Sequence, residues 1–347
     1  MIQNVQILPR NEAYWQENEW KKLLSSAISS PIELLQLLEI DIDTLPYTID
    51  VEQQFAQRVP IPFVERMQKG NPYDPLLLQI LPLSEENQKV SGFVSDPLQE
   101  HEGASPGLLH KYNSRVLMML ATSCAINCRY CFRREFPYSK HNAGKAGWRE
   151  AFSYIAEHSE INEVILSGGD PLMVKDSYLQ EFVEQLEGIK HVKRLRIHTR
   201  LPLVIPQRVT QQLVEILSKT RLQSVVVMHI NHPQEIDLSV KKAMHRLNSA
   251  GVTLLNQSVL LNNINDDVDT LARLSEALFD CNILPYYLHL LDRVSGVHHF
   301  EVTEQNAVQI MQDLQTKLAG FLVPKLVREQ AGKSSKSLID LNVNHSE

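Results

Sequence analysis

Three of the four cysteines in the chain, Cys124, Cys128 and Cys131, lie within eight residues of one another. Thiolates at this CxxxCxxC spacing can bind three irons of a cubane cluster, which leaves the fourth iron open for a ligand that is not protein. A structural zinc site is the alternative, but such sites are closed by four protein ligands, and no fourth ligand lies near in sequence. The spacing therefore predicts an iron-sulfur cluster with an open coordination position.

Three other places in the sequence are candidates for chemistry. Glycines such as those in Ser167-Gly168-Gly169-Asp170 let a backbone approach a ligand closely, although most such turns only join a strand to a helix. Gln257 lies in an apolar segment, where a glutamine is more often structural. Lys336 lies in a polar segment, where a lysine is usually a solvated charge. The residues alone therefore leave these roles open.

From residue 115 onward, short apolar segments alternate with amphipathic segments. The helical spacing i, i+3, i+4, i+7 recurs in residues 176–186 and again in 307–318. Apolar strands that alternate with helices are typical of parallel βαβ units buried on both faces. Six or seven units favour an α/β barrel or partial barrel, with its chemistry at the C-terminal ends of the strands. The expected strands are 115–122, 163–166, 194–198, 224–230, 252–260, 284–290 and 321–327.

The first hundred residues follow a different pattern. Ser30 can cap a helix in which Pro31 takes the first position and Glu33 completes a capping box ahead of a leucine-rich face. Prolines and glycines between residues 60 and 106 indicate an irregular connector. We expect an N-terminal helical domain with its connector over residues 1–100, a barrel over 101–330 and a C-terminal segment over 331–347.

Composition and charge exclude several classes of protein. The 347 residues are 43% hydrophobic and 22% charged, which is ordinary for a folded protein, and the net charge of −7 argues against nucleic-acid binding by bulk charge. No signal peptide and no apolar run of about 20 residues is present, so no membrane partner is expected. Clustered cysteines suit a reducing compartment, and we expect a cytoplasmic protein in which Cys281 is an inert core residue.

With the cysteine motif placed after the first strand of a βα barrel, the chain resembles the radical S-adenosylmethionine superfamily. Its flanking segments resemble the lysine 2,3-aminomutase family in the same order along the chain. The resemblance covers roughly residues 60 to 340 and implies a partial (β/α)6-type TIM barrel of parallel strands. The segments that carry it are Arg129–Arg134, Leu166–Leu172, Asn256–Leu260 and Lys336.

The resemblance implies that S-adenosylmethionine binds the open iron of a [4Fe-4S] cluster. The turn Ser167, Gly168, Gly169 and Asp170 is similar to the segment that contacts the amino group of this cofactor. Gln257 resembles a further contact. The remaining two candidates are Tyr130, which could border the adenine, and His229, for which a satisfied core histidine is nearly as good an interpretation.

The resemblance also implies pyridoxal 5′-phosphate. The family attaches this cofactor to a lysine after the last barrel strand, and Lys336 matches that lysine, with Lys333 as the second choice. Lys111, Tyr112 and Arg115 resemble the group that binds the phosphate. Lys111 stands where an arginine is expected, which would change a bidentate contact into a point charge.

The substrate needs opposite charges at the two ends of its pocket. Arg133 matches the residue that binds the α-carboxylate, while Asp292 and Glu329 match two acids that hold a side-chain ammonium. On sequence alone these residues could equally be surface ion pairs. Two acids favour L-lysine over glutamate. Glu329 stands where the family usually has aspartate, and residues 331–335 replace a purer glycine run, so a differently shaped pocket is expected.

The reaction that the resemblance implies is an isomerisation. One electron from the cluster would cleave S-adenosylmethionine to methionine and a 5′-deoxyadenosyl radical, which would take hydrogen from C3 of lysine held as a pyridoxal imine. The amino group would then move from C2 to C3, and return of the hydrogen would regenerate the cofactor. The short chain after Lys336 and its Arg-Glu-x-x-Gly-x-x-Ser-Lys ending resemble the branch that makes (R)-β-lysine for elongation factor P. Expected partners are a flavodoxin or ferredoxin type electron donor, the lysyl-ligase of that pathway and a second copy of the chain.

Four other interpretations remain open at this point. The chain could make free β-lysine, act on another amino acid, or use radical chemistry without pyridoxal phosphate. It could also be a non-catalytic iron-sulfur protein, although the glycine turn and Lys336 would then have no purpose.

Overall fold

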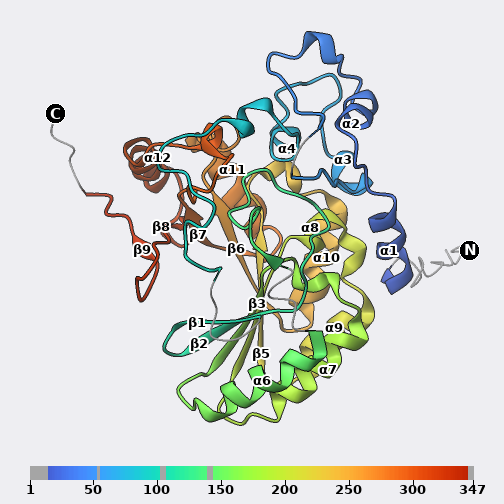
Figure 1. The fold of residues 1–347 in the computed structure, drawn as a ribbon, viewed down its shortest axis with the longest axis vertical. Coiled ribbons are helices and arrows are strands. Elements are labelled where there is room, and N and C mark those ends of the chain that lie inside the picture. Colours follow the sequence, from blue (N-terminus) through green and yellow to red (C-terminus); the bar gives the residue numbers. More distant parts are fainter. Residues whose placement is uncertain (1–14, 53–54, 102–106, 139–143, 343–347) are drawn as a thin grey trace, which may run out of the picture.

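The computed structural model describes residues 15–52, 55–101, 107–138 and 144–342, and its centre is one nine-stranded sheet (Figure 1). The strands follow one another in chain order, β1 to β9. Those from β2 to β8 are parallel, whereas β1 and β9 pair antiparallel at the two ends. The strands are β1 (Leu108–Tyr112), β2 (Arg115–Met119), β3 (Glu163–Ser167), β4 (Arg194–Thr199), β5 (Gln223–His229), β6 (Thr253–Val259), β7 (Leu284–His289), β8 (Lys325–Arg328) and β9 (Ser337–Leu338).

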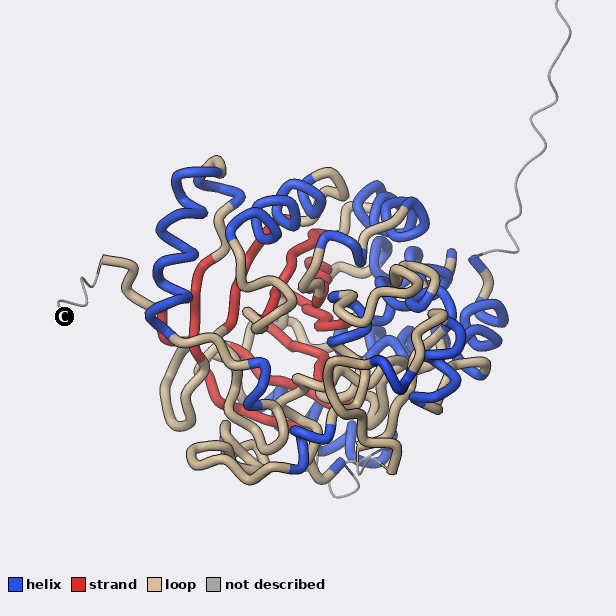
Figure 2. The backbone as a smooth tube through the Cα atoms, turned by 90° about the horizontal axis from the view of Figure 1, so that it is seen from above, coloured by secondary structure: helices blue, strands red, loops and turns tan. Residues whose placement is uncertain are grey.

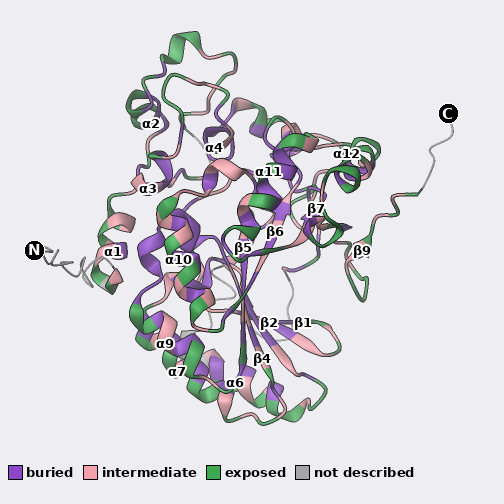
Figure 3. Cartoon of the chain, turned by 180° about the vertical axis from the view of Figure 1, so that it is seen from behind, coloured by how far each residue is buried: buried purple, intermediate pink, exposed green. Residues whose placement is uncertain are grey.

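Helices fill the crossovers between the parallel strands, so six βα units join seven strands. Figure 2 shows the strands as an open, curved row with helices along its outer side. Leucine, isoleucine and valine from both layers form the core, and the helices turn their exposed faces outward (Figure 3). The fold is therefore an α/β open barrel. Its helices are α6 (Gly144–Glu157), α7 (Asp176–Glu187), α8 (Leu201–Val204), α9 (Gln211–Lys219), α10 (Leu238–Ser249), α11 (Val268–Phe279) and α12 (Glu304–Lys317).

The segment before the barrel is mostly short helices and turns that pack on the barrel. Ser30 accepts a hydrogen bond from the backbone of Glu33, as expected for a cap. Helix α1 contacts the 3-10 helix η5 (Pro206–Arg208), and α3 contacts α8. The elements are α1 (Glu17–Ser25), α2 (Pro31–Leu37), α3 (Ile61–Val64), α4 (Pro75–Leu78) and the 3-10 helices η2 (Ile42–Thr44) and η3 (Ser84–Asn87).

The sequence pattern missed both terminal hairpins. Residues 108–112 include His110 and Lys111, which do not alternate in the way a half-buried strand does, and β9 has only two residues. The expected strand over 321–327 was wrong at its start, because 320–322 form the 3-10 helix η8 and β8 begins at Lys325. Both hairpins carry residues of the candidate site.

Two expectations about single features can be checked directly. Cys281 is 2% exposed, and burial raises the pKa of its thiol to about 11, which fits an inert core cysteine. Within the described ranges, no helix combines the length and the apolar character that a membrane crossing requires.

The turn after β3 packs directly against the loop after β2. The backbone N–H of Gly169 donates to the carbonyl of Ala121 at 3.2 Å, and that of Asp170 to the carbonyl of Ser123 at 3.0 Å. A Cβ atom at Gly169 would lie 2.7 Å from the nitrogen of Ser123 and 2.8 Å from its oxygen. Only glycine fits here, and the contact sets the position of the chain just before Cys124.

We expect Gly169→Ala to lower the free energy of unfolding by about 1–3 kcal/mol, because the added methyl group must push the Ser123 backbone away. It should also reduce the iron bound after reconstitution. The control is Gly320→Ala, since nothing lies within 4 Å of a Cβ at Gly320. Denaturant unfolding and iron analysis measure both effects, and equal stability and iron content in the two variants would contradict the packing argument.

Candidate active site

The three clustered cysteines lie in the loop after β2, and all are free and partly buried. Residues from the segment before the barrel hold this loop. Buried Arg129 donates from Nε and Nη2 to the two carboxylate oxygens of Glu86, at 2.8 and 2.5 Å. Arg134 shares Glu86 at 2.6 Å, and the backbone of Arg129 donates to the carbonyl of Gln79 at 2.8 Å. A buried, charge-assisted network thus fixes the loop.

The thiols fit an iron-sulfur cluster better than a single metal ion. Burial raises the pKa of Cys124 well above its ordinary value and that of Cys131 to about 11, and the neighbouring thiols add to both shifts. Thiolates therefore need a compensating positive charge. In the described part of the chain, no three side chains of histidine, cysteine, aspartate or glutamate are grouped closely enough to hold one metal ion. In a cubane each cysteine binds a different iron, so the sulfurs need not meet at one point.

The carboxylate of Asp170 is used within the chain. It accepts hydrogen bonds from Thr199 Oγ1 at 2.7 and 2.9 Å and from the backbone N–H groups of Leu172, Arg200 and Leu201 at 2.8 to 3.0 Å. Asp170 thereby joins the turn after β3 to the end of β4. Any contact of this turn with a ligand falls to its backbone and to Ser167.

A cavity of about 400 Å³ lies along the inner side of the sheet, from the first residues of β2 and β3, Arg115 and Glu163, to residues at and beyond the carboxyl ends of the strands. Nearly every strand contributes a polar group to it. Of the expected site residues, Tyr130, Gly168, Gly169, Asp170 and the cysteines do not line it. Those that do are Lys111, Tyr112, Arg115, Arg133, Ser167, His229, Gln257, Asp292, Glu329 and Lys336.

Three half-buried histidines, His198, His229 and His289, line this cavity. Burial lowers the pKa of His229 and His289 to about 3, and that of His198 well below its usual value, so all three imidazoles are neutral. In each, the Nε2 atom has no hydrogen-bond partner among the described residues. Buried polar atoms are rarely left unpaired, so these nitrogens are available to hydrogen-bond a ligand or water in the cavity. Tyr130 stacks on His229, with 5.6 Å between ring centroids.

The hairpin of β8 and β9 brings Glu329 and Lys336 together. Arg328 pairs with Ser337 in the antiparallel ladder, so the next residues toward the turn, Glu329 and Lys336, face each other. The ammonium of Lys336 donates to Glu329. Although burial acts in the opposite direction, this ammonium lowers the pKa of Glu329 to about 2. Lys333 lies in the same turn but is exposed and does not line the cavity.

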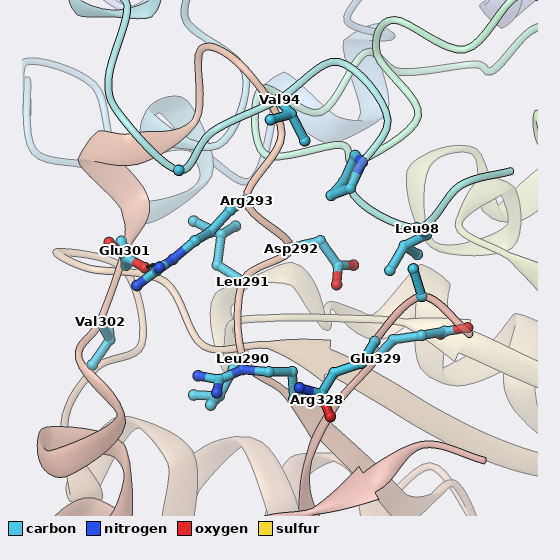
Figure 4. A pocket seen from close by; sticks show the side chains of 14 residues that line it. Val94, Leu98, Leu290, Leu291, Asp292, Arg293, Glu301, Val302, Arg328 and Glu329 are labelled. Carbon is cyan, nitrogen blue, oxygen red and sulfur yellow. Dashed lines mark hydrogen bonds and ion pairs between the residues drawn. The ribbon is translucent and has the colours of Figure 1, made fainter. Parts of the chain in front are cut away.

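Asp292 follows β7 and is the second acid of the cavity. Burial and the charge of Glu329 raise its pKa to about 7. Asp292 and Glu329 also line an outer pocket of about 360 Å³, so the two hollows adjoin at these carboxylates (Figure 4). In that pocket Arg293 is already paired with Glu301 at 2.6 Å. Within the described residues Asp292 therefore has no ion-pair partner, whereas the neighbouring Glu329 is paired with Lys336.

Glu100 holds two of the expected cations. Its carboxylate accepts from Lys111 Nζ at 2.7 Å and from Arg133 Nε at 2.8 Å, and Arg133 also donates to Ser167 at 3.2 Å. In the first hairpin, the Arg115 guanidinium lies 4.0 Å from the ring centre of Tyr112. The structure therefore brings the three expected phosphate ligands to one wall of the cavity.

Sequence reasoning missed several residues of the site. Glu100 lies in a polar connector, and nothing in its neighbours marks it. His198 is the penultimate residue of β4 and His289 the last residue of β7, and a polar residue at such a position is a weak signal of a site. Arg200, which follows β4, donates to the Cys128 sulfur at 2.6 Å and was not singled out.

Comparisons with known proteins agree with this geometry. A family model described as the radical SAM superfamily matches residues 118–274. The L-lysine 2,3-aminomutase of Haemophilus influenzae is 50% identical over 335 residues, covering 96% of this chain and 99% of that protein. The enzyme of the same name from Escherichia coli is 50% identical, covering 94% and 95%. That from Clostridium subterminale is 32% identical, covering 94% and 78%. This chain therefore belongs to the lysine 2,3-aminomutase family, a family of radical S-adenosylmethionine isomerases.

Proposed function

We propose that this chain converts L-lysine to (R)-β-lysine, with a [4Fe-4S] cluster, S-adenosylmethionine and pyridoxal phosphate as cofactors. The observation that carries the proposal is the placement of Lys336, Asp292 and Glu329 in one cavity with the cations Lys111, Arg115 and Arg133. An acidic amino acid would bring a third carboxylate against the two acids. Lysine instead brings an ammonium, which pairs with both.

Each cofactor has a set of residues that fits it. Cys124, Cys128 and Cys131 would hold the irons. Ser167, Gln257 and the unpaired Nε2 of His229 would contact S-adenosylmethionine, with Tyr130 behind His229. Lys336 would hold the pyridoxal, and its phosphate would lie on Lys111, Tyr112 and Arg115. Together these cofactors supply a carbon radical and an electron sink for migration of the amino group.

The chain itself positions the substrate and moves one proton. Lys336 must lose a proton before its amine can bond to an aldehyde, and Glu329, which contacts Nζ, is placed to accept it and to release it to water, which restores the carboxylate. When Lys336 is neutral, Glu329 loses the ammonium that contributes most to lowering its pKa. The ε-ammonium of lysine then becomes the cation beside Glu329 and Asp292. Arg133 takes the α-carboxylate in place of Glu100, and the walls of the cavity limit the access of water.

The destination of the product is the finer part of the proposal. This chain covers 99% and 95% of the two relatives that are 50% identical to it. It covers only 78% of the Clostridium subterminale enzyme, which is 32% identical. This supports a distinct branch, for which we propose (R)-β-lysine for elongation factor P, made in the cytoplasm. Partners would be the lysyl-ligase, a flavodoxin or ferredoxin type donor, and a second copy of the chain. Release of free β-lysine is the second candidate.

The test is an anaerobic assay of the reconstituted protein with reductant, S-adenosylmethionine, pyridoxal phosphate and L-lysine, followed by chiral analysis. We expect (R)-β-lysine. A protein with full cluster and bound pyridoxal that forms no β-lysine would refute lysine as the substrate. Formation of the S product would refute the proposed branch.

Removal of single ligands should separate the two cofactors. We expect Cys128→Ala to lose iron and all activity, because a cubane needs all three thiolates. Lys336→Ala should keep its iron and lose the visible absorbance of bound pyridoxal. Lys333→Ala is the matched control and should keep both. Pyridoxal that is retained by Lys336→Ala and lost by Lys333→Ala would reverse the assignment.

The affinity for L-lysine should depend on pH through Asp292. Its pKa of about 7 lies above the ordinary aspartate value, so its negative charge is present at pH 8 and mostly lost at pH 6. We expect the dissociation constant for lysine, measured without reductant, to rise about tenfold from pH 8 to pH 6. Asp292→Asn should bind weakly at both values. An equally steep pH dependence in this variant would rule Asp292 out as the titrating group.

A further inference from the structure

Arg200 is a buried cation that contacts the cysteine loop directly. It follows β4 at the start of α8 and is 7% exposed. Its Nη1 atom donates to the sulfur of Cys128 at 2.6 Å and to the hydroxyl of Tyr130 at 2.6 Å. The guanidinium carbon also lies 5.3 Å from the ring centre of Phe63. A positive charge is thus fixed beside one of the three thiols.

The other nitrogen of the guanidinium faces away from the thiol. Its Nη2 atom donates to Gln79 and to Glu235, each at 2.8 Å. Glu235 is fully buried and is itself held by the backbone N–H groups of Asn231 and His232. The carboxylate and the sulfur therefore lie at different nitrogens of one planar, pre-organised donor, with no freedom for the guanidinium to turn.

We propose that Arg200 is a positioning residue for the bound cluster: its hydrogen bond to the Cys128 sulfur raises the midpoint potential at which the cluster accepts an electron. The inference rests on the cluster of the proposed function and adds a determinant of its redox chemistry. The step is one-electron reduction of [4Fe-4S]²⁺ to [4Fe-4S]⁺, with the electron supplied by a low-potential one-electron reductant.

The direction of the effect follows from the charges. Reduction adds one negative charge to the cluster, and hydrogen bonds to its sulfurs stabilise that charge. Arginine stays protonated throughout, so its field does not change between the two states. Burial keeps the interaction from being screened by water or salt. Glu235 offsets part of the positive charge of Arg200, but it accepts from Nη2, whereas Nη1 donates to the Cys128 sulfur.

The experiment is an anaerobic redox titration of the reconstituted protein, with the reduced cluster followed by electron paramagnetic resonance. In Arg200→Gln we expect the ratio of reduced to oxidised cluster at a fixed potential to fall about tenfold. For a one-electron couple this is a midpoint about 59 mV more negative. Iron and sulfide content, measured in parallel, should match the wild type.

The matched control is Arg208→Gln. Arg208 is fully buried, pairs with Asp176 at 2.7 Å and lies over the ring of Trp20 at 5.0 Å. It donates to the carbonyl oxygens of Leu172 and Val174. We expect it to lose stability while its midpoint stays at the wild-type value. The same midpoint shift in both arginine variants would overturn the proposal, because it would reflect general loosening.

The remaining outcomes also decide the matter. Arg200→Gln with full iron content and an unchanged midpoint would overturn the role of Arg200. If that variant does not bind a cluster, Arg200→Lys decides: three N–H groups cannot serve four acceptors, and the ammonium will take the Glu235 carboxylate before the sulfur. A midpoint below wild type in Arg200→Lys supports the proposal, and an unchanged one overturns it. A wild-type chain without any cluster would instead refute the proposed function.

Discussion

The structure depends on one electrostatic constraint: charges that are removed from water at the carboxyl end of the barrel must be paired. The parallel sheet brings charged residues from distant parts of the chain to that end, and three of its cations lie in ion pairs there. Lys336 contacts Glu329, Arg133 contacts Glu100, and Arg200 contacts Glu235. In such a pair, a ligand group of the right charge can replace one of the two partners. A lysine substrate, with one carboxylate and one remote ammonium, matches the two pairs that line the cavity.

The segment before the barrel is part of the site for the same reason. Glu86 neutralises two arginines of the cysteine loop, Gln79 contacts both that loop and Arg200, and Glu100 holds Arg133. Removing a single partner from such a buried pair usually costs more than the pair contributes, because a charge is left uncompensated. The segment before the barrel therefore does more than cover the barrel, since it supplies acids that the arginines of the site need.

Local patterns predicted the parts of the structure that local physics controls. Apolar periodicity located the seven parallel strands, and the cysteine spacing and the glycine turn were correctly placed at strand ends. The pairing of distant charges was not predictable, because Glu100, Arg200 and Glu235 lie in segments whose neighbours give no signal. Lys336 was found only by family resemblance. Its meeting with Glu329 depends on the β8–β9 hairpin, which is too short and too polar to stand out in the sequence.

The central claim is that one cavity brings the residues expected to contact S-adenosylmethionine together with those expected to bind lysine. Turnover of L-lysine deuterated at C3, with mass spectrometry of the recovered S-adenosylmethionine and product, tests it most directly. The account predicts deuterium in the adenosyl group of S-adenosylmethionine and at C2 of β-lysine, with little exchange into solvent. Deuterium that is lost to water, or that stays entirely at C3 of the product, would contradict it.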